Sequence, residues 1–350
     1  MGPSVRVNQD DIRIWAPIIV LCAAMLSASL LIAINGGQRP FFNIVVYAAG
    51  ELAAVLIAIM SFAFFRVFQL ARVLADEPLR SVWAELRPKL SLFLVPLVAF
   101  PLFLAGFTAA KSSIGMMVGY HFDGFFALAD ASIFGTDPWR ITHALLRERE
   151  TKIIDFVYGP VWTAVFGLSI AFVPAFCKKQ TAGQFFITIF MTWFVGGFLA
   201  AYALSSAGPV FAYLVDPAVG ARFAPLRVDL ARLFPPDSVL AASSTYLEQG
   251  FRTGKVMTAG GISAMPSMHI ATVTIYILLT KGTRLFWPAV GLAALILVGS
   301  VHTGYHYFVD APVAAAIALL CWKTAGALLL SENRAVERIL VQSEAVEPLN

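Results

Sequence analysis

Long apolar runs alternate with polar segments along most of the chain. A run of about 20 apolar residues is long enough to cross a bilayer as a helix, and eight runs approach that length. They cover residues 14–34, 43–65, 90–110, 153–176, 185–204, 266–280, 285–302 and 307–329. The pattern therefore predicts an all-α integral membrane protein with about eight transmembrane helices.

The spacing of these runs predicts the organisation of the chain. The sixth run is short for a membrane span, and only residues 281–284 separate it from the seventh, so these two runs should form a tight helical hairpin. Two long segments, 111–152 and 205–265, interrupt the pattern as loops. We expect three units: two accessory helices with a cytoplasmic loop in 1–89, a six-helix domain in 90–330, and a polar cytoplasmic tail in 331–350.

The first long loop contains a stretch that mixes aromatic and acidic residues. Residues 120–139 read YHFDGFFALADASIFGTDPW and include Asp123, Asp130 and Asp137. Aromatic side chains accumulate at the level of the lipid headgroups. We therefore expect an interfacial helix here.

The composition agrees with a membrane protein. Hydrophobic residues make up 59% of the chain and charged residues only 13%, and the mean hydropathy is +0.78. A soluble domain carries about 25% charged residues. The net charge of +4 is therefore no sign of a nucleic-acid partner. The three cysteines are an odd number with no CxxC pair, so neither a disulfide framework nor a zinc site is predicted.

The positions of the basic residues predict an orientation. Lys and Arg concentrate in short cytoplasmic loops, and placing residues 66–89 inside puts most basic residues of the short loops and span ends inside as well. Both termini are then cytoplasmic. The protein is expected to be a multi-pass protein of a cell inner membrane, with the segments before His269 and before the last span on the outer face.

A histidine and an aspartate stand before the last apolar run. In GSVHTGYHYFVDAPVAAA, residues 299–316, His306 and Asp310 are four positions apart. On a helix this spacing places both side chains on one face. Asp310 can then accept a hydrogen bond from one imidazole nitrogen, which leaves the other nitrogen of His306 as a nucleophile or general base.

A second polar cluster opens the sixth run. In SAMPSMH, residues 263–269, Pro266 suits the first turn of a helix, whose free N–H groups and dipole attract an anion. A phosphate bound there could accept from Ser267 and lie within reach of His269. The two clusters together predict metal-independent phosphoryl transfer: His306 attacks phosphorus, and His269 protonates the departing alkoxide. Water or an acceptor hydroxyl then removes the phosphoryl group from His306.

These two motifs resemble those of the type 2 phosphatidic acid phosphatase superfamily. Its second motif contains Pro-Ser and a histidine, as PSMH does, and its third contains His-x-x-x-Asp, as HYFVD does about forty residues later. The resemblance implies a six-helix core formed by spans three to eight. It implies that Ser267 binds phosphate and that His269 is the general acid. It also implies that His306 is the nucleophile and that Asp310 orients it.

Two features are similar to the inositol phosphorylceramide synthase-like branch of that superfamily. They are the Thr-x-x-His-Tyr-x-x-Asp stretch at residues 303–310 and a Gly-Pro turn at residues 208–209. By this resemblance the transferred group would be a phospho-headgroup, and the acceptor a lipid alcohol such as ceramide or diacylglycerol.

The sequence lacks two groups of cations that the superfamily uses to bind phosphate. The first motif, a Lys followed by Arg-Pro, is missing near residues 200–209, where ALSSAGPV stands. Gly299 and Ser300 replace the Ser-Arg pair that opens the third motif. A buried phosphate needs a positive partner, and the nearest cations along the chain are Arg252 and Lys255. Further candidates are Lys111, Arg222 and Arg227.

The leading hypothesis is a membrane lipid phosphotransferase without a cofactor. Its substrate would be a lipid phosphate or phospholipid, and its acceptor a lipid alcohol. The alternative is a lipid phosphate phosphatase of the phosphatidate or polyprenyl phosphate type, with water as the acceptor.

Two further alternatives concern other uses of the ionisable residues. His302, His306 and Asp310 could form a metal-binding face on one helix, although a structural role is expected for His302 and His143. A proton-coupled transporter would use the histidines as a relay. That reading requires ionisable residues deep in several spans, and the sequence offers little beyond Glu51.

Overall fold

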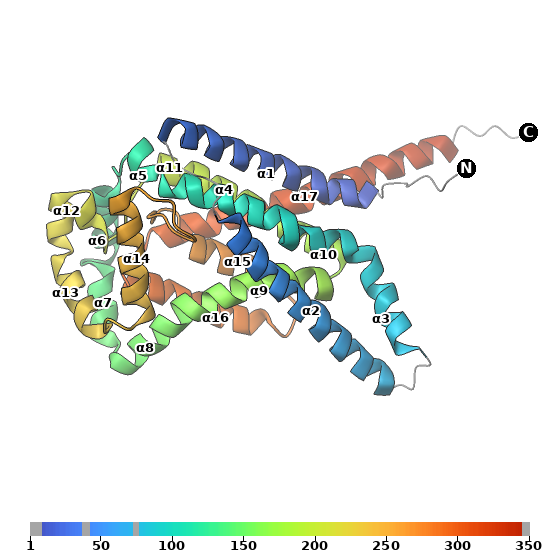
Figure 1. Cartoon of the computed structure of the whole chain (residues 1–350), viewed down its shortest axis with the longest axis horizontal. Helices are drawn as coiled ribbons and strands as arrows, with labels where there is room; N and C mark the ends of the chain where they lie inside the picture. Colours follow the sequence, from blue (N-terminus) through green and yellow to red (C-terminus); the bar gives the residue numbers. More distant parts are fainter. Residues whose placement is uncertain (1–8, 37–42, 73–76, 345–350) are drawn as a thin grey trace, which may run out of the picture.

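The computed structural model describes residues 9–36, 43–72 and 77–344, with the side chains of residues 11–34, 43–72 and 77–330. Within these residues every regular element is a helix, as the apolar pattern predicted (Figure 1). Residues 345–350 of the predicted tail lie outside the described part of the chain.

Among the described residues, six helical stretches are long and apolar enough to cross a membrane, so the protein is an integral membrane protein. They are Asp11–Ile34, Ile44–Arg72, Pro78–Ser112, Glu148–Phe176, Lys179–Ala203 and Asp310–Leu330. The sixth and seventh predicted runs form shorter apolar helices, α15 (Met268–Thr280, 13 residues) and α16 (Phe286–His302, 17 residues). At 1.5 Å per residue these two helices are about 20 and 26 Å long, shorter than the hydrocarbon core.

Three of the six spans contain short segments with a different helical pitch. The third span comprises α3 (Pro78–Leu86), a 3₁₀ segment, a π segment (Val95–Ala99) and α4 (Phe100–Ser112). The fourth span comprises α8 (Glu148–Phe156), a π segment (Val157–Val161) and α9 (Trp162–Phe176). The fifth span comprises α10 (Lys179–Phe194), a π segment (Val195–Ala200) and α11 (Ala201–Ala203). Pro96 and Pro160 lie within π segments, where a missing N–H is tolerated. The third span starts at Pro78, so the domain boundary predicted at residue 89 falls inside it.

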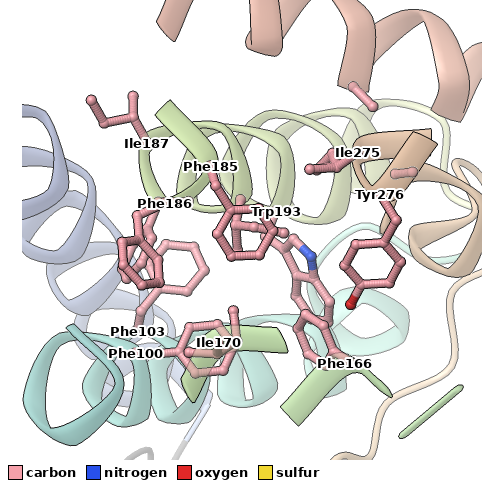
Figure 2. Packing of buried hydrophobic residues seen from close by; sticks show 14 of the residues in the cluster. Phe100, Phe103, Phe166, Ile170, Phe185, Phe186, Ile187, Trp193, Ile275 and Tyr276 are labelled. Carbon is pink, nitrogen blue, oxygen red and sulfur yellow. The ribbon is translucent and has the colours of Figure 1, made fainter. Parts of the chain in front are cut away.

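The bundle is packed with aromatic side chains. Phe100 and Phe103 of α4 meet Phe190 of α10 with ring centroids 6.1 and 4.9 Å apart. Phe166 of α9 stacks on Trp193 of α10, with ring centroids 4.9 Å apart (Figure 2). Lipid tails are as apolar as these rings, so close van der Waals packing, rather than removal from water, holds such helices together.

The two accessory helices pack against different faces of the bundle. α1 (Gln9–Gly36) contacts α4 and α10, and α2 (Ile44–Arg72) contacts α9 and α4. An ion pair of 2.7 Å between Asp11 and Lys179 ties the start of α1 to the start of α10. Glu51 is buried within α2, 7% exposed. Its carboxylate lies 4.0 Å from the position that a Cβ on Gly167 of α9 would take, so it faces the helix contact.

The last three helices hold the two predicted clusters. α15 and α16 form the expected hairpin, and α15 also packs against α10 and against α17 (Asp310–Glu344). α17 continues without a break to Glu344, so the tail boundary predicted at residue 331 falls inside a helix.

The two long segments predicted as loops form a helical cap over one end of the bundle, which we define as residues 113–147 and 205–265 (Figure 1). Its helices are α5 (Ile114–Met117), α6 (Asp123–Phe134), α7 (Pro138–Leu145), α12 (Pro217–Arg222), α13 (Ala224–Leu233) and α14 (Val239–Thr253). The cap has its own apolar cluster, which includes Phe126, Phe211 and Phe223. The start of α1 and the end of α17 lie at the opposite end of the molecule.

Candidate active site

His306 lies in the turn that joins α16 to α17, and not on a helix. α16 ends at His302 and α17 begins at Asp310, so our prediction that one helix carries both His306 and Asp310 is wrong. The predicted contact between the two side chains is confirmed, because His306 Nδ1 lies 3.2 Å from Asp310 Oδ2. The N–H of Tyr307 donates to the same oxygen at 3.0 Å. Asp310 therefore holds the turn and the imidazole together.

A backbone carbonyl determines which nitrogen of His306 carries the proton. The carbonyl oxygen of Ala264 lies 2.7 Å from His306 Nδ1, closer than Asp310 does. A carbonyl oxygen only accepts hydrogen bonds, so Nδ1 is the donor and the lone pair of the neutral ring is on Nε2. The segment just before Ser267 thus fixes the tautomer, a role that the sequence suggested for Asp310 alone.

Ser267 caps α15, and its Oγ accepts from the N–H of Ile270 at 3.4 Å. The helix begins at Met268, so Pro266 precedes the cap, and our prediction that it occupies the first helical turn is wrong. Ser267 is fully buried. The first free N–H groups of α15 therefore begin beside a buried hydroxyl, which is a suitable environment for an anion.

His269 is held between two aromatic rings. The ring centroids of Tyr158 and Trp162 lie 4.5 and 4.0 Å from that of its imidazole. The centroids of His269 and His306 are 6.0 Å apart, with an interplanar angle of 66°. The two rings enclose the imidazole and so fix its orientation. We did not predict this arrangement, although the four-residue spacing of Tyr158 and Trp162 places both on one helix face.

Asp123 of α6 fastens the cap to the turn that carries His306. It accepts hydrogen bonds from the N–H groups of Ala207 and Gly208, at 2.9 and 2.8 Å, and from the hydroxyl of Tyr307 at 2.9 Å. Burial raises the pKa of Asp123, while these three donors act in the opposite direction. One carboxylate thus joins residues 207–208 to the residue next to His306.

Asp130, two turns further along α6, makes a similar connection. It accepts from the N–H groups of Phe308 and Val309 at 2.8 and 3.0 Å, and burial raises its pKa. We expected an interfacial helix from the aromatic residues of this segment, but its carboxylates face inward and hold the site. The spacing of seven between Asp123 and Asp130, which places both on one face of α6, would have indicated this.

Residues 205–210 support the same turn from the other side. The N–H of Val210 donates to the carbonyl of Gly304 at 2.9 Å. Gly208 has a φ of +90°, and a Cβ on it would lie 2.4 Å from the carbonyl oxygen of Tyr305. Only glycine fits there. In this chain the backbone of residues 205–210 therefore packs directly against the backbone of the turn that carries His306.

The remaining histidines near the turn have protein partners. His302 Nε2 lies 3.0 Å from the hydroxyl oxygen of Thr151, and His143 Nε2 lies 2.8 Å from the carbonyl oxygen of His302. In the part of the chain that the structure describes, no group of three or more His, Cys, Asp or Glu side chains could hold a metal ion. His302, His306 and Asp310 therefore do not form the metal-binding face that we considered.

A family model of the PAP2 superfamily, the type 2 phosphatidic acid phosphatases, matches residues 130–324, more than half of the chain. The chain belongs to the PAP2 superfamily. This membership assigns it to the lipid phosphatases and phosphotransferases, with a lipid phosphate as substrate. Comparisons with curated proteins and with solved structures found no match.

The two cations that we favoured as replacements for the missing PAP2 cations lie on the surface of the cap. Arg252 is exposed and forms an ion pair of 2.7 Å with Glu248. A hydrogen bond from the Tyr213 hydroxyl and the charge of Arg252 lower the pKa of Glu248, which keeps this carboxylate ionised. Lys255 is exposed just after the end of α14.

The other three candidates differ in their surroundings. Arg222 is paired with Asp137 at 2.6 Å, and Arg227 lies over the ring of Tyr213 at 4.1 Å. Lys111, at the end of α4, is half-buried. Its charge acts on the imidazole of His269, so it is the candidate that lies near the site.

Proposed function

We propose that this PAP2 protein is a membrane lipid phosphotransferase that uses His306 as a covalent nucleophile. The transferred unit is a phosphoryl group or phospho-headgroup of a lipid, and the acceptor is a lipid alcohol. The observation that supports this most directly is the short contact of His306 Nδ1 with the Ala264 carbonyl. It leaves the Nε2 lone pair of a buried, oriented imidazole for attack on phosphorus.

The reaction would proceed in two displacements. His306 Nε2 forms a bond to phosphorus as the bond from phosphorus to the lipid oxygen breaks, and His269 gives its proton to that oxygen. The acceptor hydroxyl then attacks phosphorus, loses its proton to His269, and the phosphorus–nitrogen bond breaks. The imidazole of His306 recovers its lone pair, and His269 is protonated again for the next cycle.

The scarcity of cations favours transfer of a phospho-headgroup over hydrolysis of a phosphate monoester. A phosphodiester carries one negative charge, whereas a monoester approaches two at neutral pH. The cations of the superfamily's first motif are missing, and residues 205–210 act as backbone support. A site with few cations suits a singly charged group, as in the inositol phosphorylceramide synthase-like branch that the motifs resemble.

The test is a lipid screen on the purified protein, read by mass spectrometry with and without an added lipid alcohol. We expect a new lipid ester that forms only with the alcohol, that survives a metal chelator, and that falls about 10⁴-fold or more in His306→Ala. Release of the free headgroup phosphate without a new ester would indicate the phosphatase alternative. Unchanged turnover in His306→Ala would exclude the nucleophile.

The role of His269 has a separate test. A general acid matters most for a poor leaving group, and its removal costs about 10²–10⁴-fold. His269→Ala should therefore slow transfer from an alkyl phosphate by that factor but spare the p-nitrophenyl ester of the same phosphate, because nitrophenolate departs without a proton. Equal losses on both substrates would contradict proton donation by His269.

A further inference from the structure

Lys111 lies on the face of α4 that points toward the start of α15. Phe107 precedes it by one turn on the same face. A Cβ on Gly197 would lie 2.6 Å from the ring of Phe107 and 3.0 Å from the sulfur of Met268, the residue after Ser267. The α4 face that carries Lys111 therefore abuts the N-terminal end of α15.

The backbone of Lys111 also packs against the segment that leads to Ser267. A Cβ on Gly261 would lie 2.9 Å from the carbonyl carbon of Lys111 and 3.0 Å from its Cγ. Gly261 also has a φ of +90°, so glycine allows this segment to approach α4 so closely. The ammonium group is close enough for its charge to act on His269.

Lys111 has no partner of opposite charge. Among the residues that the structure describes, it forms no ion pair and donates no hydrogen bond, whereas Arg222 and Arg252 are both paired with carboxylates. A half-buried ammonium without a partner is unfavourable, and in membrane proteins such a charge marks a ligand site.

Two further donors beside His269 lack acceptors. The hydroxyl of Tyr158 and the indole Nε1 of Trp162 are buried and have no hydrogen-bond partner among the described residues. Tyr158 is only 5% exposed. Lys111 and these two donors offer positive charge and hydrogen bonds beside the start of α15, with no matching acceptor among the described residues. A ligand rich in negatively charged oxygen atoms would satisfy them.

We propose that Lys111 binds the phosphate group of the lipid substrate and replaces the cations of the missing first motif. It comes from the end of α4, some 90 residues before the position of that motif. The inference rests on the proposed function, because the phosphate would lie between His306, His269 and the start of α15. Lys111 would hold the charge of the phosphate in the ground state and as it moves onto His306.

The experiment uses full-length protein in detergent and the variants Lys111→Met, Lys111→Arg and Arg252→Gln, each also combined with His306→Ala. Binding of inorganic phosphate is measured by calorimetry in the His306→Ala background, where no covalent bond can form. Turnover of short-chain phospholipids is measured with His306 intact. The melting temperature without phosphate reports on folding.

We expect Lys111→Met to weaken phosphate binding about 10- to 100-fold, as loss of a charged hydrogen bond does, and to raise KM for the lipid. Lys111→Arg should restore part of the affinity, and Arg252→Gln should stay within about twofold of the parent. Removing a charge without a partner should leave the melting temperature equal or higher. A lower melting temperature with unchanged phosphate affinity would identify a structural lysine and overturn the proposal.

The two proposals can fail separately. If His306→Ala retains turnover, the covalent mechanism is wrong, whatever Lys111 does to phosphate binding. If His306→Ala abolishes turnover but Lys111→Met binds phosphate and lipid as the parent does, only the role of Lys111 is wrong. If Arg252→Gln loses phosphate binding and Lys111→Met does not, the cation that binds phosphate is Arg252 of the cap, and the role of Lys111 is wrong.

Discussion

Asp310 uses one carboxylate oxygen for two hydrogen bonds, from the N–H of Tyr307 and from His306 Nδ1. Its other oxygen, Oδ1, is buried without a hydrogen-bond partner among the described residues. An asparagine could place its carbonyl oxygen where Oδ2 lies and keep both bonds. Compared with an asparagine, the aspartate therefore adds only its charge. In the mechanism that we propose, this charge would stabilise the His306 ring, which gains positive character as it bonds to phosphorus.

This geometry makes Asp310→Asn a test of charge alone. In a serine-protease triad the same change costs about 10⁴-fold, because the histidine adopts the wrong tautomer. Here the Ala264 carbonyl still requires a proton on Nδ1, so we expect kcat to fall only about 10- to 100-fold. The measurement is single-turnover phosphohistidine formation, with Asp310→Ala as the more severe comparison. A loss of 10⁴-fold in Asp310→Asn would mean that the carbonyl does not hold the tautomer.

At the scale of elements, α6 is the connection between the cap and the turn of His306. Its two buried carboxylates accept five hydrogen bonds from residues 207–208 and 307–309. The N–H groups of Phe308 and Val309 in the turn donate to Asp130, so these two backbone donors depend on α6. The cap thus positions the turn of His306 from outside the bundle.

Asp123→Ala should destabilise the cap by about 2–4 kcal/mol, because it leaves two buried N–H groups and one hydroxyl without an acceptor. Tyr307→Phe is the matched control, since it removes only the hydroxyl and should cost about 1 kcal/mol. Chemical unfolding in detergent gives the free energies, and kcat should fall in Asp123→Ala more than in Tyr307→Phe. Equal stability of the two variants would show that residues 207–208 do not need this carboxylate.

At the scale of the whole molecule, the cap covers one end of the bundle, and the start of α1 and the end of α17 lie at the other (Figure 1). The site lies where cap and bundle meet, formed by the turn of His306 and the start of α15. Which end faces the cytoplasm is predicted only from the basic residues, and that prediction places the cap outside.

Labelling of single cysteines tests the orientation. In a variant with Cys22, Cys177 and Cys321 replaced by serine, Arg252→Cys on the cap should react with a membrane-impermeant maleimide in cells whose inner membrane is intact. Arg87→Cys, exposed in the third span near its predicted cytoplasmic end, should react only after the membrane is opened. The reverse pattern would place the active site in the cytoplasm.

Much of the membrane architecture could be predicted because apolar length is a local property. The hairpin of α15 and α16 and the contact of His306 with Asp310 also depend on residues close in sequence, and both are present. The ends of the helices were harder to predict. We placed the start of the third span at residue 90 instead of Pro78, because polar residues such as Arg87 and Lys89 interrupt the apolar run there. We also extended α17 back to residue 307, although the turn continues to Val309.

The sequence by itself determined that this is a helical membrane protein with a histidine–aspartate pair and a Pro-Ser-x-His stretch before two of its apolar helices. Only the tertiary structure decided how the pair is completed. The Ala264 carbonyl is 42 residues from His306, and Asp123 is 184 residues from Tyr307. Lys111, too, meets Gly261 only because two distant segments pack side by side. Hydrogen bonds and charges act over a few ångströms in space, whatever the separation along the chain, so no local pattern could indicate these partners.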